Sequence, residues 1–186
     1  MIPWFPLETE RLLLREFRLE DEGGIYEYAS DPEVVRFASW GPSDISTVRA
    51  NLRRRLKEQE SWPRDSIEVA VELRSISCLI GILRMSIVDH ANRTADFGYV
   101  FNRRYWKNGY ATEGTRVLLN LAFSKLNLHR VWATCDVRNH ASRRVMEKLG
   151  MRREGFFRKD VMQKGEWRDS YLYAVLAEEW DSAVIN

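Results

Sequence analysis

The sequence predicts a single α/β domain over residues 1–186, with a mixed, mostly antiparallel sheet of about seven strands flanked by helices. Three observations support this prediction. Residues 67–73 alternate apolar and polar side chains, as a half-buried strand does. Val48, Leu52 and Leu56 recur every four residues, which predicts a helix with one narrow buried stripe. The order of the expected elements combines hairpins with crossovers over helices, so both strand directions are expected.

The hydrophobicity patterns place strands at residues 11–17, 67–73, 79–88, 95–101, 130–137, 154–162 and 168–176. Helices are expected at residues 19–30, 47–60 and 112–126, with a short fourth helix between Asn139 and Gly150. Asp31-Pro32 ends the first helix, because the residue before a proline disfavours helical backbone. Ser46 or Thr47 is the expected N-cap of the second helix.

The composition is that of a soluble globular protein, with 45% hydrophobic and 30% charged residues. Twenty-nine basic and 27 acidic residues give a formal charge of +2, which is too balanced to require a nucleic-acid partner. The two cysteines, Cys78 and Cys135, show no CxxC or metal-ligand spacing, so neither a disulfide framework nor a metal site is expected. No apolar run of about 18 residues occurs, and we expect a cytoplasmic protein without a membrane anchor.

The segment from Lys107 to Thr112 is suited to holding a phosphorylated ligand. Gly109 permits a turn that a Cβ would obstruct, and Ala111 lets the backbone approach a ligand closely. The first N–H groups of the following helix have no intrahelical partner and are free to bind an anion. Arg103, Arg104 and Lys107 add positive charge to this loop.

A plain helix start preceded by a solvated basic loop is the alternative interpretation of that segment. The position of the turn directly after a strand favours the ligand site. Neither a G-x-x-x-x-G-K-[ST] nor a G-x-G-x-x-G pattern is present, so a phosphorylated cofactor other than those served by these motifs is needed.

The residues of this segment resemble the acetyl-CoA-binding core of the GNAT N-acetyltransferases. The closest resemblance is to the branch that includes the ribosomal-protein-alanine (Rim-type) acetyltransferases. Four motifs carry it, at residues 95–114 (A-D-F-G-Y-V-F…Y-W-K-N-G-Y-A-T-E-G), 136–151 (D-V-R-N-H-A-S-R-R-V-M-E-K-L-G-M), 9–15 (T-E-R-L-L-L-R) and 165–169 (G-E-W-R-D). The resemblance therefore spans nearly the whole chain and implies a single GNAT-like domain.

The resemblance implies acetyl-CoA as the cofactor. Backbone amides of residues 109–112 are expected to hold its pyrophosphate, and residues 99–101 to bind pantetheine amides as an added strand does. Trp106 replaces the Arg or Gln that many GNAT proteins have three residues before the loop glycine, which shifts phosphate contact to the backbone and nearby cations. The expected cofactor-binding residues are Tyr99, Val100, Phe101, Arg103, Arg104, Lys107, Asn108, Gly109, Tyr110, Ala111, Thr112, Asn139 and Ser142.

Asp96 and Ser142 are the candidate catalytic residues. Asp96 stands where the family often has Glu and could accept the amine proton through a water, or it could face solvent or pair with an arginine. Ser142 could donate a proton to the departing thiolate, or it could be an ordinary residue at a helix start. No tyrosine lies between Tyr110 and Tyr171, so the tyrosine acid of many GNAT proteins has no counterpart here.

The expected reaction is acetyl transfer to a primary amine, either a protein N-terminal α-amine or a small molecule, by direct attack in a ternary complex. A catalytically silent acyl-CoA-binding or RNA-associated module is the alternative. Arg49, Arg53, Arg54 and Arg55 form a basic helix face that is either solvated or a dock for RNA or the ribosome. The three histidines are expected at the surface, and the protein is expected to be a monomer or a homodimer.

Overall fold

The structure is a computed structural model that describes residues 4–61 and 63–180, so the two ends of the predicted 1–186 domain lie outside the described residues. Its strands are β1 Leu7–Glu8, β2 Leu12–Arg15, β3 Ser66–Leu73, β4 Cys78–Asp89, β5 Thr94–Phe101, β6 Arg130–Asp136, β7 Arg152–Gln163 and β8 Glu166–Leu176. Its helices are α1 Glu22–Ala29, α2 Ile45–Glu58, α3 Tyr110–Ser124, α4 His140–Lys148 and α5 Ala177–Trp180, with short 3₁₀ helices η1 Leu19–Asp21 and η2 Arg103–Tyr105.

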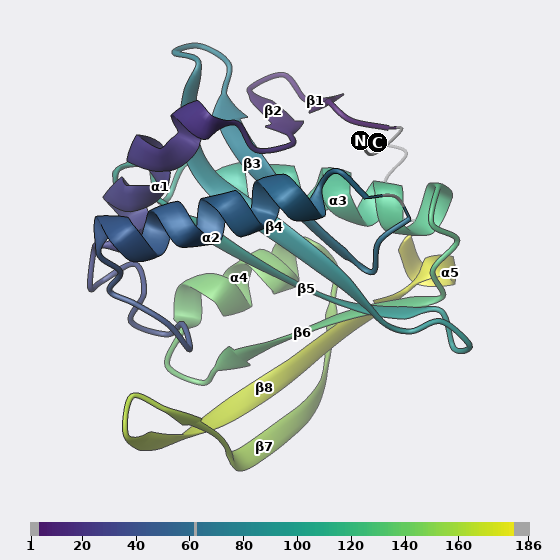
Figure 1. The fold of residues 1–186 in the computed structure, drawn as a ribbon. Helices are drawn as coiled ribbons and strands as arrows, with labels where there is room; N and C mark the ends of the chain where they lie inside the picture. Colours follow the sequence, from purple (N-terminus) through teal and green to yellow (C-terminus); the bar gives the residue numbers. More distant parts are fainter. Residues whose placement is uncertain (1–3, 62, 181–186) are drawn as a thin grey trace. The chain divides into compact units, whose positions relative to one another are not determined.

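The described strands form one mixed sheet in the order β1-β2-β3-β4-β5-β6-β8-β7 (Figure 1). The pairs β1–β2, β2–β3, β6–β8 and β7–β8 are antiparallel, whereas β5 and β6 are parallel. The predicted mixed, mostly antiparallel sheet is therefore confirmed. Eight strands occur where about seven were expected, because β1 has only two residues and shows no periodicity.

Contacts within the chain group its residues into two compact units. The first unit comprises Met1–Arg84 and Tyr99–Val117, and the second comprises Met85–Gly98 and Leu118–Asn186.

The core of the first unit joins α1 and α2 to the strands β3 and β4. Val48 and Leu52 of α2 are buried and Leu56 packs against the same cluster, as their four-residue spacing predicts. The cluster consists of Phe17, Ile25, Tyr28, Ala29, Val48, Leu52, Ala70, Leu79 and Ile82. Burial of these apolar side chains supplies the main stabilisation of this unit.

A buried ion triad ties three segments of the first unit together. Arg15 of β2 donates from Nη2 to Asp21 Oδ1 and from Nε to Glu72 Oε2, each at 2.7 Å. The three side chains are 8%, 4% and 12% exposed. Because water cannot solvate them, each charge depends on its partners.

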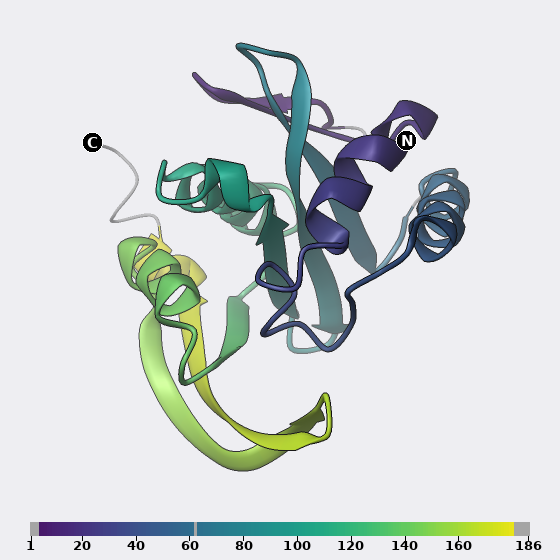
Figure 2. The same cartoon turned by 90° about the vertical axis from the view of Figure 1, so that its left-hand side faces the viewer.

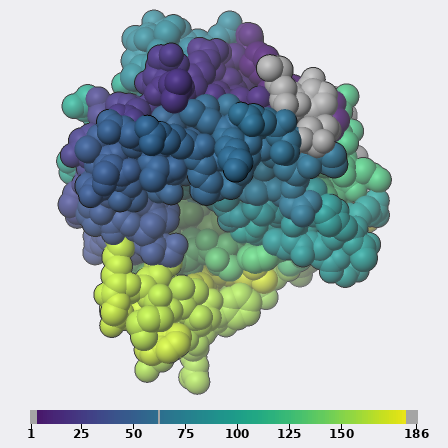
Figure 3. Space-filling model, in the orientation of Figure 1, coloured from purple at the N-terminus to yellow at the C-terminus, as the bar shows by residue number. Residues whose placement is uncertain are grey.

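The second unit contains the long β7–β8 hairpin, which is strongly curved in Figure 2. Its ladder has two irregularities, between Arg153 and Gly155 and between Phe157 and Val161 on β7. Extra residues of this kind bend the strand that carries them. Figure 3 shows the surface of this hairpin in yellow, where Phe156 and Trp167 are more than half exposed, at 52% and 54%.

Several expected boundaries differ from the structure by one to three residues, and two of these differences concern the start of a helix. The N-cap of α2 is Asp44, not Ser46 or Thr47, because the helix begins at Ile45 and the Thr47 N–H donates to Asp44 Oδ1 at 2.7 Å. Helix α3 begins at Tyr110, two residues earlier than expected, because the turn at Gly109 already provides the acceptor for the first helical N–H.

The Arg15 triad makes a prediction about stability. Arg15→Ala leaves two buried carboxylates without their counter-charge, so the free energy of unfolding should fall by about 3 kcal/mol or more. Urea denaturation followed by circular dichroism measures this change. Arg54→Ala is the control, because its main ion pair, with Glu58, has side chains that are 48% and 50% exposed and its contact with Glu68 is long, at 3.8 Å, so the loss should be about 1 kcal/mol or less. Equal losses in the two variants would show that the triad has no special role.

Candidate functional site

The loop between β5 and α3 is fixed by contacts of its own residues. Asn102 is buried; its side chain accepts from the Arg104 N–H at 3.0 Å, and its own N–H donates to the Ile80 carbonyl at 2.8 Å. Trp106 donates Nε1–H to the Phe101 carbonyl at 2.7 Å. These bonds connect η2 and the loop to the end of β5, so the loop leaves the strand in a defined direction.

The turn that precedes α3 has two residues in the left-handed region, Lys107 at φ +65 and Gly109 at φ +83. Gly109 fits this conformation because it has no Cβ. Asn108 lies between them and donates from its side chain to the carbonyls of Tyr105 and Trp106, at 3.2 and 3.0 Å. Hydrogen bonds from the Asn108 side chain to the backbone therefore stabilise the turn, which leads directly into the helix.

Residues 109–112 present unused donors at the start of α3. The first intrahelical bond runs from the Glu113 N–H to the Gly109 carbonyl at 3.0 Å. Among the described residues, the N–H groups of Gly109, Tyr110, Ala111 and Thr112 have no acceptor. Their donors and the positive end of the helix dipole suit an anion. A pyrophosphate fits this donor set.

Two of the three predicted cations are already engaged with carboxylates. Arg103 Nε lies 2.9 Å from Asp31 Oδ2, and Arg104 Nη1 lies 3.4 Å from Glu27 Oε2. The sequence could not reveal this, because the partners are more than 70 positions away along the chain. Lys107 is the one of the three that forms no ion pair with a described residue.

In the second unit, the parallel ladder between β5 and β6 is short. It runs from Thr94 opposite Arg130 to Asp96 opposite Trp132, whereas β6 continues to Asp136 with β8 as its partner. Asp96 is half-buried and stands at the last position of that ladder.

The turn from β6 into α4 is held by Asp136, whose side chain is 3% exposed. Asp136 Oδ1 accepts from the Arg138 N–H at 2.9 Å, and Oδ2 accepts from Arg138 Nη2 at 2.7 Å. Arg168 of β8 adds a weaker contact at 3.6 Å. The turn carrying Asn139 is therefore fixed from both sides.

Asn139 is the N-cap of α4, as the sequence predicts. Its side-chain oxygen accepts from the Ser142 N–H at 3.1 Å, which leaves the amide NH₂ available. Ser142 is half-buried in the first turn of the helix. Asn139 and Ser142 are thus joined by the capping hydrogen bond within the second unit. The expected pyrophosphate-binding residues 109–112 belong to the first unit.

Two titratable groups near α4 were not expected as parts of the site. Tyr173 of β8 is 2% exposed and donates to Glu147 Oε1 at 3.2 Å; burial and the Glu147 carboxylate raise the pKa of Tyr173. Burial raises the pKa of Cys135 to about 11. At neutral pH both groups keep their protons, and the Cys135 thiol is not a nucleophile.

Other candidate groups contribute little chemistry. His90, His129 and His140 are all exposed, as expected. No cluster of three or more potential metal ligands occurs among residues 4–61 and 63–180. The described helices include none that is both long enough and apolar enough to cross a membrane.

Comparison with known proteins decides the family. Residues 11–152 match the model of the acetyltransferase (GNAT) domain family. The chain belongs to the GNAT acetyltransferases.

Relatives of this GNAT chain cover nearly its whole length. "Uncharacterized N-acetyltransferase YnaD" of Bacillus subtilis (strain 168) is 39% identical, with 94% of this chain and 99% of the relative covered. "Putative ribosomal N-acetyltransferase YdaF" of the same strain is 33% identical, with 78% of each chain covered. A crystal structure of an acetyltransferase (GNAT family) from Bacillus anthracis has a TM-score of 0.83 and 35% identity, covering 93% of this chain and 99% of that one. The predicted family, its Rim-type branch and the N-acetyltransferase class are confirmed.

The capping bond predicts how Asn139 variants behave. Asn139→Ala removes the acceptor for the Ser142 N–H and should lower the free energy of unfolding by about 1 kcal/mol. Asn139→Asp keeps an equally good acceptor and should leave stability within a few tenths of a kcal/mol. Thermal unfolding of both variants tests this pair, and equal losses would show that the cap contributes nothing.

Proposed function

We propose that residues 1–186 form one acetyl-CoA-dependent N-acetyltransferase domain, which moves an acetyl group to a primary amine by direct attack in a ternary complex. The observation that carries the proposal is the start of α3, where the four N–H groups of residues 109–112 have no acceptor among the described residues. A GNAT chain needs a binding site for the CoA pyrophosphate, and a helix N-terminus binds anions well.

The pantetheine arm is assigned to β5 and to the start of α4. The ladder between β5 and β6 ends at Asp96, and we assign the following β5 residues 99–101 to the pantetheine, which would add to them as a strand does. The side-chain NH₂ of Asn139 supplies a donor for a pantetheine carbonyl, because its oxygen is occupied by the Ser142 N–H. Residues 99–101 of the first unit and Asn139 of the second are therefore each proposed as contacts of the cofactor.

Bound acetyl-CoA supplies the thioester whose carbonyl carbon the amine attacks, with the C–N bond forming as the C–S bond breaks. Asp96 is assigned as the base that accepts the amine proton through a water. Ser142 is assigned as the donor of a proton to the departing thiolate. Because burial raises the pKa of Cys135, that thiol is not assigned as a nucleophile.

The acceptor is a protein N-terminal α-amine or a small-molecule amine. The name of YdaF points to a ribosomal acceptor for that relative, and this supports testing a protein N-terminus first. Docking to RNA through α2 has less support, because Arg49 is paired with Glu22 and Arg54 with Glu58. The proposed location is the cytoplasm.

Acetyl-CoA turnover with an amine panel tests the proposed reaction. Wild-type protein should release CoA thiol only when an acceptor amine is present, and Asp96→Asn should lower kcat by at least about 100-fold with unchanged affinity for CoA. Thiol release is followed with a chromogenic disulfide, and CoA affinity by calorimetry. CoA binding without acceptor-dependent release would favour the silent module, and wild-type turnover in Asp96→Asn would remove Asp96 as the base.

The proposed pyrophosphate-binding site at residues 109–112 predicts the effect of Gly109→Glu. The new side chain would begin 3.6 Å from Arg11 Nη2 at a position of φ +83, and its negative charge would oppose an anion at the start of α3, so CoA binding should be lost. Gly165→Glu is the matched control, because Gly165 has φ +78, has open space around its Cβ position and lies in the β7–β8 turn. Calorimetry should show wild-type CoA affinity for the control. Unchanged CoA affinity in Gly109→Glu would refute the proposed pyrophosphate-binding site.

A further inference from the structure

Arg11, from the motif at residues 9–15, reaches the start of α3 through three contacts. Its Nε donates to Glu113 Oε2 at 2.7 Å, and its Nη1 donates to the Asn108 carbonyl at 3.1 Å. Its guanidinium carbon lies 4.6 Å from the centroid of the Tyr110 ring. Thr9 holds the same carboxylate by donating Oγ1–H to Glu113 Oε1 at 2.5 Å. One arginine therefore contacts the turn, the first helical residue and the first helical turn.

The electrostatic consequence concerns Glu113. A carboxylate in the first turn of a helix favours the helix, but it also repels any anion that approaches the same N–H groups. The side chain of Glu113 is only 19% exposed, so solvent screens its charge incompletely. Arg11 neutralises this carboxylate and leaves the donors of residues 109–112 open to a second anion.

The conformational consequence concerns the turn. Lys107 has φ +65, a region that residues other than glycine enter at a cost. Neighbouring contacts must therefore hold the turn, and the bond from Arg11 to the Asn108 carbonyl is one of them. Without it the N–H groups of residues 109–112 would lose part of their fixed orientation.

We propose that Arg11 is a positioning residue for the phosphate-binding turn: it fixes the turn through Asn108 and Tyr110 and cancels the charge of Glu113. The ligand group that this arrangement would bind is a pyrophosphate. The inference rests on the proposed function, since it assigns a role within the same cofactor site.

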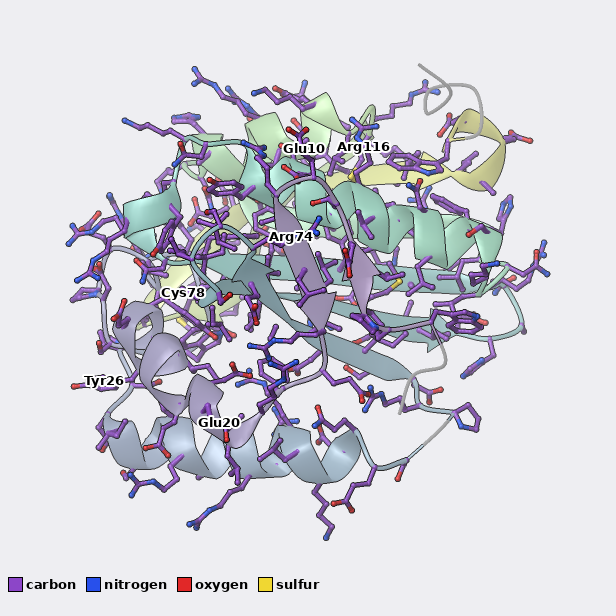
Figure 4. All side chains as sticks on the ribbon, turned by 90° about the horizontal axis from the view of Figure 1, so that it is seen from above. Glu10, Glu20, Tyr26, Arg74, Cys78 and Arg116 are labelled. Atoms are coloured by element: carbon purple, nitrogen blue, oxygen red, sulfur yellow. The ribbon has the colours of Figure 1, made fainter. Side chains whose placement is uncertain are left out.

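The test compares Arg11→Ala with Arg74→Ala. Arg74, labelled in Figure 4, is 45% exposed against 43% for Arg11, and it donates to the Thr9 carbonyl at 2.6 Å without any contact to the turn. Calorimetry with CoA should give a Kd roughly tenfold higher for Arg11→Ala, as expected for lost charge-assisted bonds. Arg74→Ala should bind as the wild type does. Urea denaturation verifies that both variants are folded.

Two further measurements distinguish positioning from general support of the fold. Acetyl-pantetheine lacks the pyrophosphate, so Arg11→Ala should raise KM for acetyl-CoA and leave kcat/KM for acetyl-pantetheine within about twofold of the wild type. Adding Glu113→Gln to Arg11→Ala removes the uncompensated charge and should recover several-fold of the lost CoA affinity. Arg11→Lys keeps the charge but not the planar fork, and it should fall between wild type and Arg11→Ala.

Several results would overturn the inference. One is an unchanged Kd for CoA in Arg11→Ala, and another is an equal rise of that Kd in Arg74→Ala. A third is an equal fall of kcat/KM in Arg11→Ala for acetyl-CoA and for acetyl-pantetheine. If Arg11→Ala does not fold, Arg11→Lys carries the same comparison, and its wild-type CoA affinity would count against the role. A wild-type protein that fails to bind CoA would overturn the proposed function itself, and this inference with it.

Discussion

The structure of the first unit depends on ion pairs of two arginines near its N-terminus, Arg11 and Arg15, whose carboxylate partners include residues far along the chain. Arg15 is almost completely buried, and it is tolerable there only because Asp21 and Glu72 surround it. Those two partners come from η1 and β3, so satisfying one charge fixes β2 against both. Such a triad adds specificity of arrangement to a core whose apolar contacts alone are not directional.

Arg11 extends the same principle to the cofactor loop. The two arginines are four residues apart, yet one holds the strand in its unit and the other holds the start of α3. The motif at residues 9–15 therefore has two roles, and neither requires contact with the reacting groups. This explains how a segment far from the glycine turn in sequence can belong to the same site.

Local patterns predicted the elements well, because strand and helix periodicities are properties of short segments. Residues 67–73 form β3 as their alternation predicts, although Ala70 and Glu72 are buried too and the strand is not half-buried, and the Asn139 cap is where its residue type demands. Long-range partners could not be predicted in this way. Arg103 and Arg104 are predicted phosphate contacts, and their pairing with Asp31 and Glu27, which come from a distant segment, could not be predicted. The role of Arg11 was invisible for the same reason.

The two edge strands of the sheet, β1 and β7, both have features that oppose pairing with another chain. An exposed strand edge invites another strand to add to it, with aggregation as the unwanted result. Here one end is β1, which has only two residues, and the other is β7, which is bent by its two irregularities. Neither offers a long, flat row of backbone groups. Both features lower the tendency of these two edge strands to pair with a strand of another chain.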